Sequence, residues 1–172
     1  MRSLRRSRKR NGCLDVSRAE PQFDELYREV ILDHYRRPRN AGALEAPTHQ
    51  AEGANPVCGD EIELDVAVEG DVICEMAFRG QGCSISQSSA SMMTERVCGG
   101  TIGEAREVMR LFEAQLVDAA EPDPELGDLE ALQGVAQFPV RVKCALLCWK
   151  VLREALNIDI DEREATTAPQ GG

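Results

Sequence analysis

The sequence predicts an α+β protein, with a small antiparallel three-stranded sheet and helices packed on it. Three observations lead to this fold class. Hydrophobic and polar residues alternate over residues 61–79, as in half-buried strands. On either side, hydrophobic residues recur every three or four positions, as in amphipathic helices. No internal repeat or linker divides the chain, so we expect one domain over residues 21–158.

The first helix is expected to begin at Pro21 and to stop before Pro38. Its apolar stripe consists of Phe23, Leu26, Tyr27, Val30 and Ile31. Residues 1–10 carry six basic side chains and no acidic one, so we expect a disordered basic tail over residues 1–20. A targeting peptide and a binding arm are the alternatives for this stretch. A second, flexible tail is expected over residues 159–172.

Two strands are expected at 61–68 and 72–79, joined by a short turn at 69–71. In the first of them, Ile62, Leu64, Val66 and Val68 would face the core, whereas Asp65 and its alternate neighbours would face solvent. A third strand before Asn55 has a weaker pattern.

The helices after the sheet have clear ends. A helix rich in Ser and Ala is expected over residues 84–97, where small side chains allow close packing, and Gly99–Gly100 ends it. Thr101 and Glu104 form a capping-box signature for the next helix. Residues 118–128 are acidic and predict an exposed loop. Phe138–Pro139 leads into the last helix.

Composition limits the function. The chain has 172 residues, a formal net charge of −10 and no apolar run long enough for a membrane span. An acidic body argues against nucleic-acid binding. Seven cysteines, an odd number, fit poorly with a disulfide framework, and no secretory signal is visible. We therefore expect a cytoplasmic protein that uses its cysteines for metal binding or thiol chemistry.

Three cysteines lie where predicted elements join: Cys58 in the loop before a strand, Cys83 at the start of a helix, and Cys144 in the first turn of the last helix. Helix N-termini favour thiolates. Asp60 follows Cys58 by two residues, so both side chains can reach one ion. Cys58, Asp60, Cys83 and Cys144 would suit tetrahedral Zn²⁺ or a small iron–sulfur cluster. Because no Cys-x-x-Cys pair exists, buried inert cysteines remain an alternative.

The other cysteines and the histidines are expected to have structural roles. Cys74 is expected in the core of a strand, Cys98 near a helix end and Cys148 in packing. His34 is expected on a helix face and His49 in a loop. Cys13 falls in the basic tail.

From about Phe23 to Asn157 the chain resembles the U-type iron–sulfur assembly proteins, the family of IscU, SufU and the NifU N-terminal domain. The matching residues are Leu26–Tyr27, Ile31–Tyr35, Pro38–Asn40, Asn55–Pro56, Cys58–Asp60, Gly80, Gly82–Ser86, Ser89–Met93, Arg141 and Lys143–Cys144.

The resemblance is nearest to the SufU branch, because Lys143 stands where IscU-like members have histidine and the segment between Cys83 and Cys144 is long. It implies a zinc-bound sulfur acceptor, a sulfur carrier or sulfurtransferase rather than a stand-alone enzyme. The implied partner is a pyridoxal-phosphate (PLP) cysteine desulfurase, SufS-like, whose persulfide supplies the sulfur. Downstream recipients would be cluster-assembly or apo iron–sulfur proteins.

Within this hypothesis Cys58 is the expected acceptor, because Gly59 leaves its loop free to bend while a helix holds Cys144, the alternative acceptor. Arg141 would offset the negative charge of the site from the second shell. The rival hypothesis is a scaffold, in which the same ligands hold a transient [2Fe–2S] cluster that is then passed on.

Overall fold

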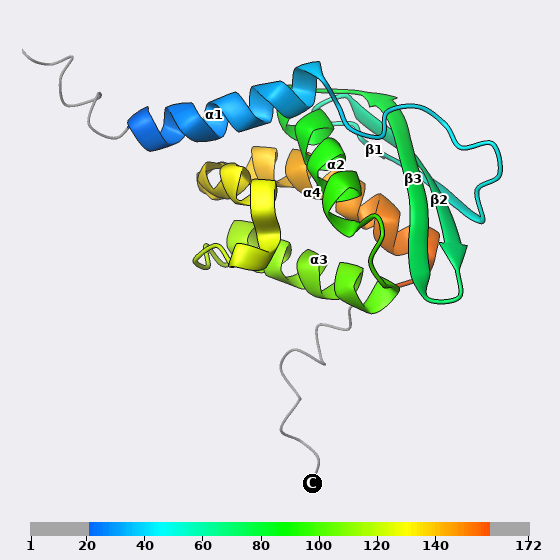
Figure 1. Cartoon of the computed structure of the whole chain (residues 1–172). Helices are drawn as coiled ribbons and strands as arrows, with labels where there is room; N and C mark the ends of the chain where they lie inside the picture. Colours follow the sequence, from blue (N-terminus) through cyan, green and yellow to red (C-terminus); the bar gives the residue numbers. More distant parts are fainter. Residues whose placement is uncertain (1–20, 159–172) are drawn as a thin grey trace, which may run out of the picture.

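Three antiparallel strands form one sheet in the order β1–β2–β3 (Figure 1). β1 spans His49–Asn55, β2 spans Asp60–Glu69 and β3 spans Val72–Gln81. The computed structural model of the chain describes residues 21–158, so the two expected tails, and Cys13 with them, lie outside the described residues. The predicted sheet is confirmed, including the strand before Asn55.

Helices cover one face of this sheet (Figure 1). Their bounds are Pro21–Arg36 for α1, Ser84–Val97 for α2, Ile102–Val117 for α3 and Pro139–Leu156 for α4, with a 3₁₀ segment, η2, at Pro124–Gln137. α4 packs on β1 and β2, α2 lies beside α4 and β3, and α1 packs on α2. The fold is thus the predicted α+β arrangement of a sheet with helices on it.

Local sequence accounts for the ends of the helices. α2 begins at Ser84 with Cys83 as its N-cap, and Thr101 and Glu104 form the predicted capping box of α3. The serines of α2 allow close packing, since Ser89 is fully buried and its hydroxyl donates a hydrogen bond of 2.7 Å to the Ala145 carbonyl of α4. α2 and α4, which carry two of the expected metal ligands at their N-terminal ends, are thereby held together.

The core lies between the sheet and the helices. Ile62, Leu64 and Val66 of β2 are fully buried, as their alternation predicts. Beneath them, the rings of Phe112 in α3 and Trp149 in α4 pack with centroids 5.4 Å apart.

The prediction that Asp65 faces solvent is wrong, because Asp65 is buried. Its carboxylate accepts hydrogen bonds from the Leu44 N–H, the Gln50 amide and the Arg79 guanidinium. The loop between α1 and β1 therefore covers this part of the outer face of the sheet.

Three further expectations are corrected. Residues 118–128 are not wholly an exposed loop, because η2 begins at Pro124 and Leu126 is buried. Cys74 is exposed rather than in the core. A register shift between Ala67 and Val68 leaves Cys74 without a partner on β2, so the strand alternation fails there. His49 is the first residue of β1 rather than a loop residue.

The expected structural roles of two other cysteines are confirmed. Cys148 is fully buried, with its sulfur 3.4 Å from the Ser89 hydroxyl. Cys98 caps the C-terminal end of α2, and its thiol donates a hydrogen bond of 3.5 Å to the Cys74 carbonyl.

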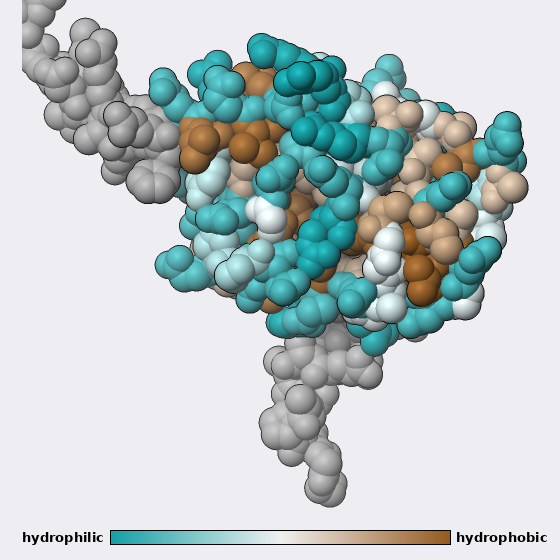
Figure 2. All heavy atoms as spheres, viewed as in Figure 1, coloured by the Kyte–Doolittle hydropathy of each residue, from teal (hydrophilic) through white to brown (hydrophobic). Residues whose placement is uncertain are grey.

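Across the described residues, no helix has the length and apolar character that crossing a membrane requires. Figure 2 shows a mostly hydrophilic surface, on which hydrophobic residues gather along α1 and over part of the sheet.

Candidate metal centre

The loop between β1 and β2 carries the first two candidate ligands. Asn55 pairs with Asp60 across the strands, so residues 56–59 make the turn. The Cys58 N–H donates a hydrogen bond of 3.2 Å to the Asn55 carbonyl, and Gly59 has a φ of +69°, which only glycine adopts without strain. This turn leaves Cys58 half-buried at the tip and Asp60 fully buried at the start of β2.

The carboxylate of Asp60 has one bonded and one free oxygen. Oδ1 accepts a hydrogen bond of 2.9 Å from the Cys83 N–H. Oδ2 is buried and has no hydrogen-bond partner among the described residues. A buried carboxylate oxygen left unpaired costs free energy, so its position calls for a cation or another donor.

Cys144 brings α4 to the same place. The helix begins at Pro139, so Cys144 lies in its second turn rather than in the predicted first turn. Its buried thiol lies 3.5 Å from the Val140 carbonyl and 3.9 Å from the Asn55 side-chain amide. One ligand atom each from Cys58, Asp60 and Cys144 lie within 4.8 Å of one another.

Cys83 stands beside this group of three. Its backbone N–H donates a hydrogen bond to the Asp60 carboxylate. Its sulfur, as the N-cap of α2, accepts a hydrogen bond of 3.5 Å from the Ser86 N–H. A Cβ atom at Gly82 would come within 2.4 Å of Asp60 Oδ1, so only glycine allows the backbone to pass this close to the carboxylate. The structure therefore brings three of the four predicted ligands together and puts the fourth next to them.

The electrostatics of the group also call for a cation. Burial raises the pKa of Cys144 well above the ordinary value of a thiol. The neighbouring Asp60 carboxyl and Cys58 thiol raise this pKa further, and so does the nearby Cys83 sulfur. Sulfur and carboxylate donors of this kind suit Zn²⁺, and the unpaired Asp60 oxygen fits a ligand role, so the residues present fit such an ion.

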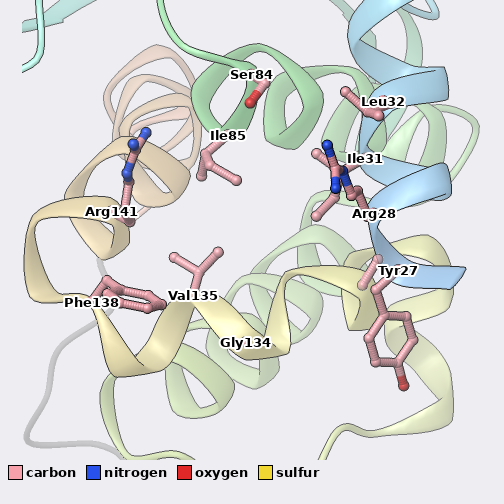
Figure 3. A pocket seen from close by; sticks show the side chains of 11 residues that line it. Tyr27, Arg28, Ile31, Leu32, Ser84, Ile85, Gly134, Val135, Phe138 and Arg141 are labelled. Carbon is pink, nitrogen blue, oxygen red and sulfur yellow. The ribbon is translucent and has the colours of Figure 1, made fainter. Parts of the chain in front are cut away.

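Arg141 lies on the rim of a groove that begins next to Cys83. The groove has a volume of about 450 Å³ and runs between α1, η2 and the first turns of α2 and α4. Figure 3 shows Arg141 and Arg28 on opposite sides of it, with Ile85 and Val135 between them and Phe138 on the side of Arg141. Within the described part of the chain, no hydrogen bond or ion pair holds the Arg141 guanidinium, and its role in offsetting the charge of the ligands stays a prediction.

Two features near the ligands were missed by sequence reasoning. Asn55 is buried and points its amide at the Cys144 sulfur. Val57, Phe138 and Val140 are hydrophobic but are 73%, 58% and 53% exposed. In the sequence, only the position of these three residues could have indicated their exposure, because Val57 precedes Cys58 and the other two lie in the turn before Cys144. Exposed apolar groups around a reactive site are typical of a surface that another protein covers.

A three-stranded sheet whose β1–β2 turn meets the start of α2 and the second turn of α4, with thiols and a carboxylate converging there, defines a class of α+β protein with a cysteine-rich metal-binding edge. Comparison with protein families identifies which one. Residues 26–157 match the family model of the NifU-like N-terminal domain, and the chain belongs to this family. The resemblance seen in the sequence is thereby confirmed.

Relatives within the family carry two kinds of name. The chain is 45% identical to the zinc-dependent sulfurtransferase SufU of Bacillus subtilis (strain 168), over 78% of this chain and 91% of that protein. It is 38% identical to the iron–sulfur cluster assembly scaffold protein IscU of Streptococcus pyogenes serotype M1, over 84% of this chain and 91% of that protein.

Solved structures agree on the fold. A SufU scaffold protein for the SUF system from Fervidobacterium islandicum AW-1 superposes with a TM-score of 0.70 at 38% identity, covering 74% of this chain and 94% of that one. A NifU-like N-terminal protein from Brucella abortus gives 0.72 at 21% identity, covering 78% and 94%, and supports the fold alone.

Proposed function

We propose that this chain is a zinc-dependent sulfurtransferase of iron–sulfur cluster assembly, which accepts persulfide sulfur from a PLP-dependent cysteine desulfurase. The observation that carries the proposal is the buried Asp60 Oδ2, which has no hydrogen-bond partner in the described part of the chain and lies beside the thiols of Cys58 and Cys144. Free thiols persist in a reducing compartment, which fits work in the cytoplasm.

Cys58, Asp60 and Cys144 hold the ion, with the neighbouring Cys83 as the fourth ligand. Bound zinc supplies positive charge that keeps these sulfurs as thiolates at neutral pH. The Asp60 carboxylate is a harder ligand than the sulfurs, so the ion is held less tightly than in an all-cysteine site and a ligand can exchange more easily. Arg141, which has no ion-pair partner within residues 21–158, stands at the edge of the groove, where its charge offsets the net negative charge of the ligand set.

Cys58 is the acceptor in this proposal. It is half-buried on a loop that Gly59 allows to bend, whereas Cys144 is fully buried in α4. The Cys58 thiolate attacks the outer sulfur of the partner's persulfide. A new S–S bond forms on Cys58, the S–S bond of the partner breaks, and its cysteine leaves as a thiolate. No net oxidation occurs, and one sulfur atom is transferred from the partner's cysteine to Cys58. Cys144 is the alternative acceptor and would first have to be uncovered.

The surroundings of the ligands supply a place for the desulfurase to dock. Val57, Phe138 and Val140 present apolar surface, and the groove offers an apolar floor between Arg28 and Arg141. A loop of the partner with an apolar residue and an acidic neighbour would match this surface. Apo iron–sulfur proteins or later assembly proteins are the proposed recipients.

A desulfurase activation assay tests the proposal. The purified chain, with its zinc measured by elemental analysis, is expected to speed cysteine turnover by a SufS-like enzyme. Cys58→Ala should abolish this stimulation, whereas Cys74→Ala, which removes an exposed thiol away from the ligands, should not. Full stimulation by Cys58→Ala would defeat its role as acceptor. If removing zinc unfolds the chain, and the intact zinc-loaded chain does not change the rate of the desulfurase, the metal is purely structural.

A second candidate function uses the same atoms. Three cysteines and one carboxylate, with Cys58 half-buried on a loop, also suit a nascent [2Fe–2S] cluster as cargo, with Asp60 as the labile ligand. The scaffold name of the Streptococcus pyogenes relative favours this reading. Anaerobic incubation with iron and sulfide distinguishes the two. A stoichiometric cluster that transfers to an apo protein supports the scaffold, whereas zinc that resists replacement supports the acceptor.

A further inference from the structure

A second group of ligand-type side chains lies where α1, α2 and η2 meet, and it shares no residue with the cysteine centre. His34 of α1, Glu95 of α2 and Asp128 of η2 each offer one ligand atom, and these three atoms lie within 4.8 Å of one another. His34 Nε2 is 2.8 Å from Asp128 Oδ2 and 3.6 Å from Glu95 Oε2.

The imidazole of His34 is held in one orientation. The residue is 1% exposed, and its Nδ1 lies 2.7 Å from the Ser91 hydroxyl. The same hydroxyl oxygen accepts a hydrogen bond of 2.9 Å from the Arg39 N–H. A hydroxyl oxygen has two lone pairs, so it can also accept Nδ1–H and leave the lone pair of Nε2 aimed at the carboxylates. Metal-bound histidines are oriented in this way by a partner at the second ring nitrogen.

The carboxylates bring more negative charge than the histidine can balance. Within the described residues, the ion pairs of Glu95 and of Asp128 are both made with His34. A neutral imidazole leaves two negative charges, and a protonated one still leaves one. Two electron-rich atoms 2.8 Å apart, His34 Nε2 and Asp128 Oδ2, need a proton or a cation between them.

The spacing fits a cation. Ligands at ~2.1 Å from a tetrahedral ion lie ~3.4 Å from each other, and octahedral neighbours lie ~3.0 Å apart. The two measured distances from His34 Nε2, 2.8 and 3.6 Å, bracket these values. Glu95 and Asp128 have side chains that are 50% and 54% exposed, so an ion can enter from solvent and keep water in its open positions.

We propose that His34, Glu95 and Asp128 form a binding site for a divalent first-row transition-metal ion. One nitrogen and two carboxylate oxygens are harder donors than thiolates, so this site accepts hard ions such as Mn²⁺ and Fe²⁺, which suit the sulfur-rich cysteine centre less well than Zn²⁺ does. The ion ties η2 to α1 and α2 from the outside.

Manganese binding tests the proposal without any activity assay. The protein is used with zinc retained at the cysteine centre and is titrated with Mn²⁺, while electron paramagnetic resonance follows the signal of the free ion. One Mn²⁺ per chain is expected to bind. Asp128→Asn and Glu95→Gln should each weaken binding at least about tenfold, because each removes a charged ligand. Glu121→Gln, the same loss of charge at an exposed position beyond α3, should bind like the unchanged protein.

Thermal denaturation gives an independent readout. An ion that binds only the folded chain raises the melting temperature, and the rise is larger the further the free ion concentration exceeds the dissociation constant. Mn²⁺ should therefore stabilise the unchanged protein and Glu121→Gln, but neither Asp128→Asn nor Glu95→Gln. Absence of binding at about 1 mM Mn²⁺, the weak end of biological cation sites, would overturn the proposal and leave a plain hydrogen bond. Equal binding by all four proteins would overturn it as well.

Discussion

Asp60 and Cys83 are joined by a hydrogen bond of 2.9 Å, in which the backbone N–H of Cys83 donates to one carboxylate oxygen of Asp60. This bond links the start of β2 to the start of α2 and fixes the direction of the second carboxylate oxygen, which is buried and has no hydrogen-bond partner among residues 21–158. The candidate metal centre is therefore organised by its carboxylate as much as by its sulfurs.

Asp60→Asn is expected to weaken zinc binding while the fold is kept. The amide oxygen can still accept the Cys83 N–H, but the charged oxygen that faces the thiols is lost. Removing a partner of a metal ligand already costs about 10- to 100-fold in affinity, and removing a ligand should cost at least as much. Competition with a chromogenic chelator measures the affinity. Glu61→Gln, an exposed neighbour, is the control, and equal affinities would contradict the ligand role of Asp60.

Gly82→Ala should destabilise the fold by about 1–3 kcal/mol, the usual range for an overpacked site. The added methyl group would meet Asp60 Oδ1 at 2.4 Å and the Ser86 hydroxyl at 2.5 Å. Urea denaturation gives the free energy of unfolding. Gly103→Ala in α3 is the matched control, because its nearest neighbour would lie at 3.8 Å, and it should be neutral or slightly stabilising. An equally small effect at Gly82 would show that this carboxylate can move aside.

Asp65→Asn should lower the free energy of unfolding by about 1–3 kcal/mol at neutral pH, since a buried charged acceptor is lost. Burial alone raises the pKa of Asp65, but hydrogen bonds from Gln50, Leu44 and Arg79 outweigh it and hold this pKa below its ordinary value.

The destabilisation caused by Asp65→Asn should depend on pH, because the pKa of Asp65 is lowered in the folded protein. A lowered folded-state pKa contributes stability above the unfolded value of about 3.9 and loses it as the pH falls through the folded value. The gap between the two proteins should therefore be widest near pH 7 and close below about pH 4. Urea denaturation at several pH values measures it, with Asp71→Asn, exposed in the β2–β3 turn, as the control. A gap that stays constant down to pH 2 would contradict this role.

Cys148 should resist alkylation in the folded protein, whereas Cys74 should react. Burial raises the pKa of Cys148 to about 12, so the thiolate that attacks an alkylating reagent is scarce at pH 8. Cys74 is exposed on β3. Mass spectrometry of digests after iodoacetamide treatment locates the modified residues, and the same treatment in denaturant shows that Cys148 can react once unfolded. Rapid labelling of Cys148 in the native protein would mean that α2 and α4 separate readily.

Local patterns were enough to predict much of the fold. The end of α2 at Val97 and the capping box of α3 follow from residues a few positions apart, and Cys58 and Asp60 are brought together by a single turn. Cys144 was harder, because nothing local indicates that the second turn of α4 reaches that turn. Its place at the start of a predicted helix suggested a ligand role, and the resemblance to a family strengthened this assignment.

What escaped prediction depended on contacts between distant segments. Asp65 became buried because the loop holding Leu44 folds over it, and Cys74 became exposed because a register shift interrupts the alternation. His34 and Asp128 are 94 residues apart, and no periodicity relates them. The helical turns of η2 were also not predicted, because its acidic first residues have the composition of a solvated loop.

The sulfur of Cys83 has a second task, because it accepts the Ser86 N–H and so caps α2. A sulfur that turns to a metal ion is a poorer acceptor for that N–H. The amide proton of Ser86 should then exchange with heavy water at a rate that reports what Cys83 is bound to. Hydrogen exchange at the first turn of α2 would thus report whether the Cys83 sulfur is bound to a metal ion.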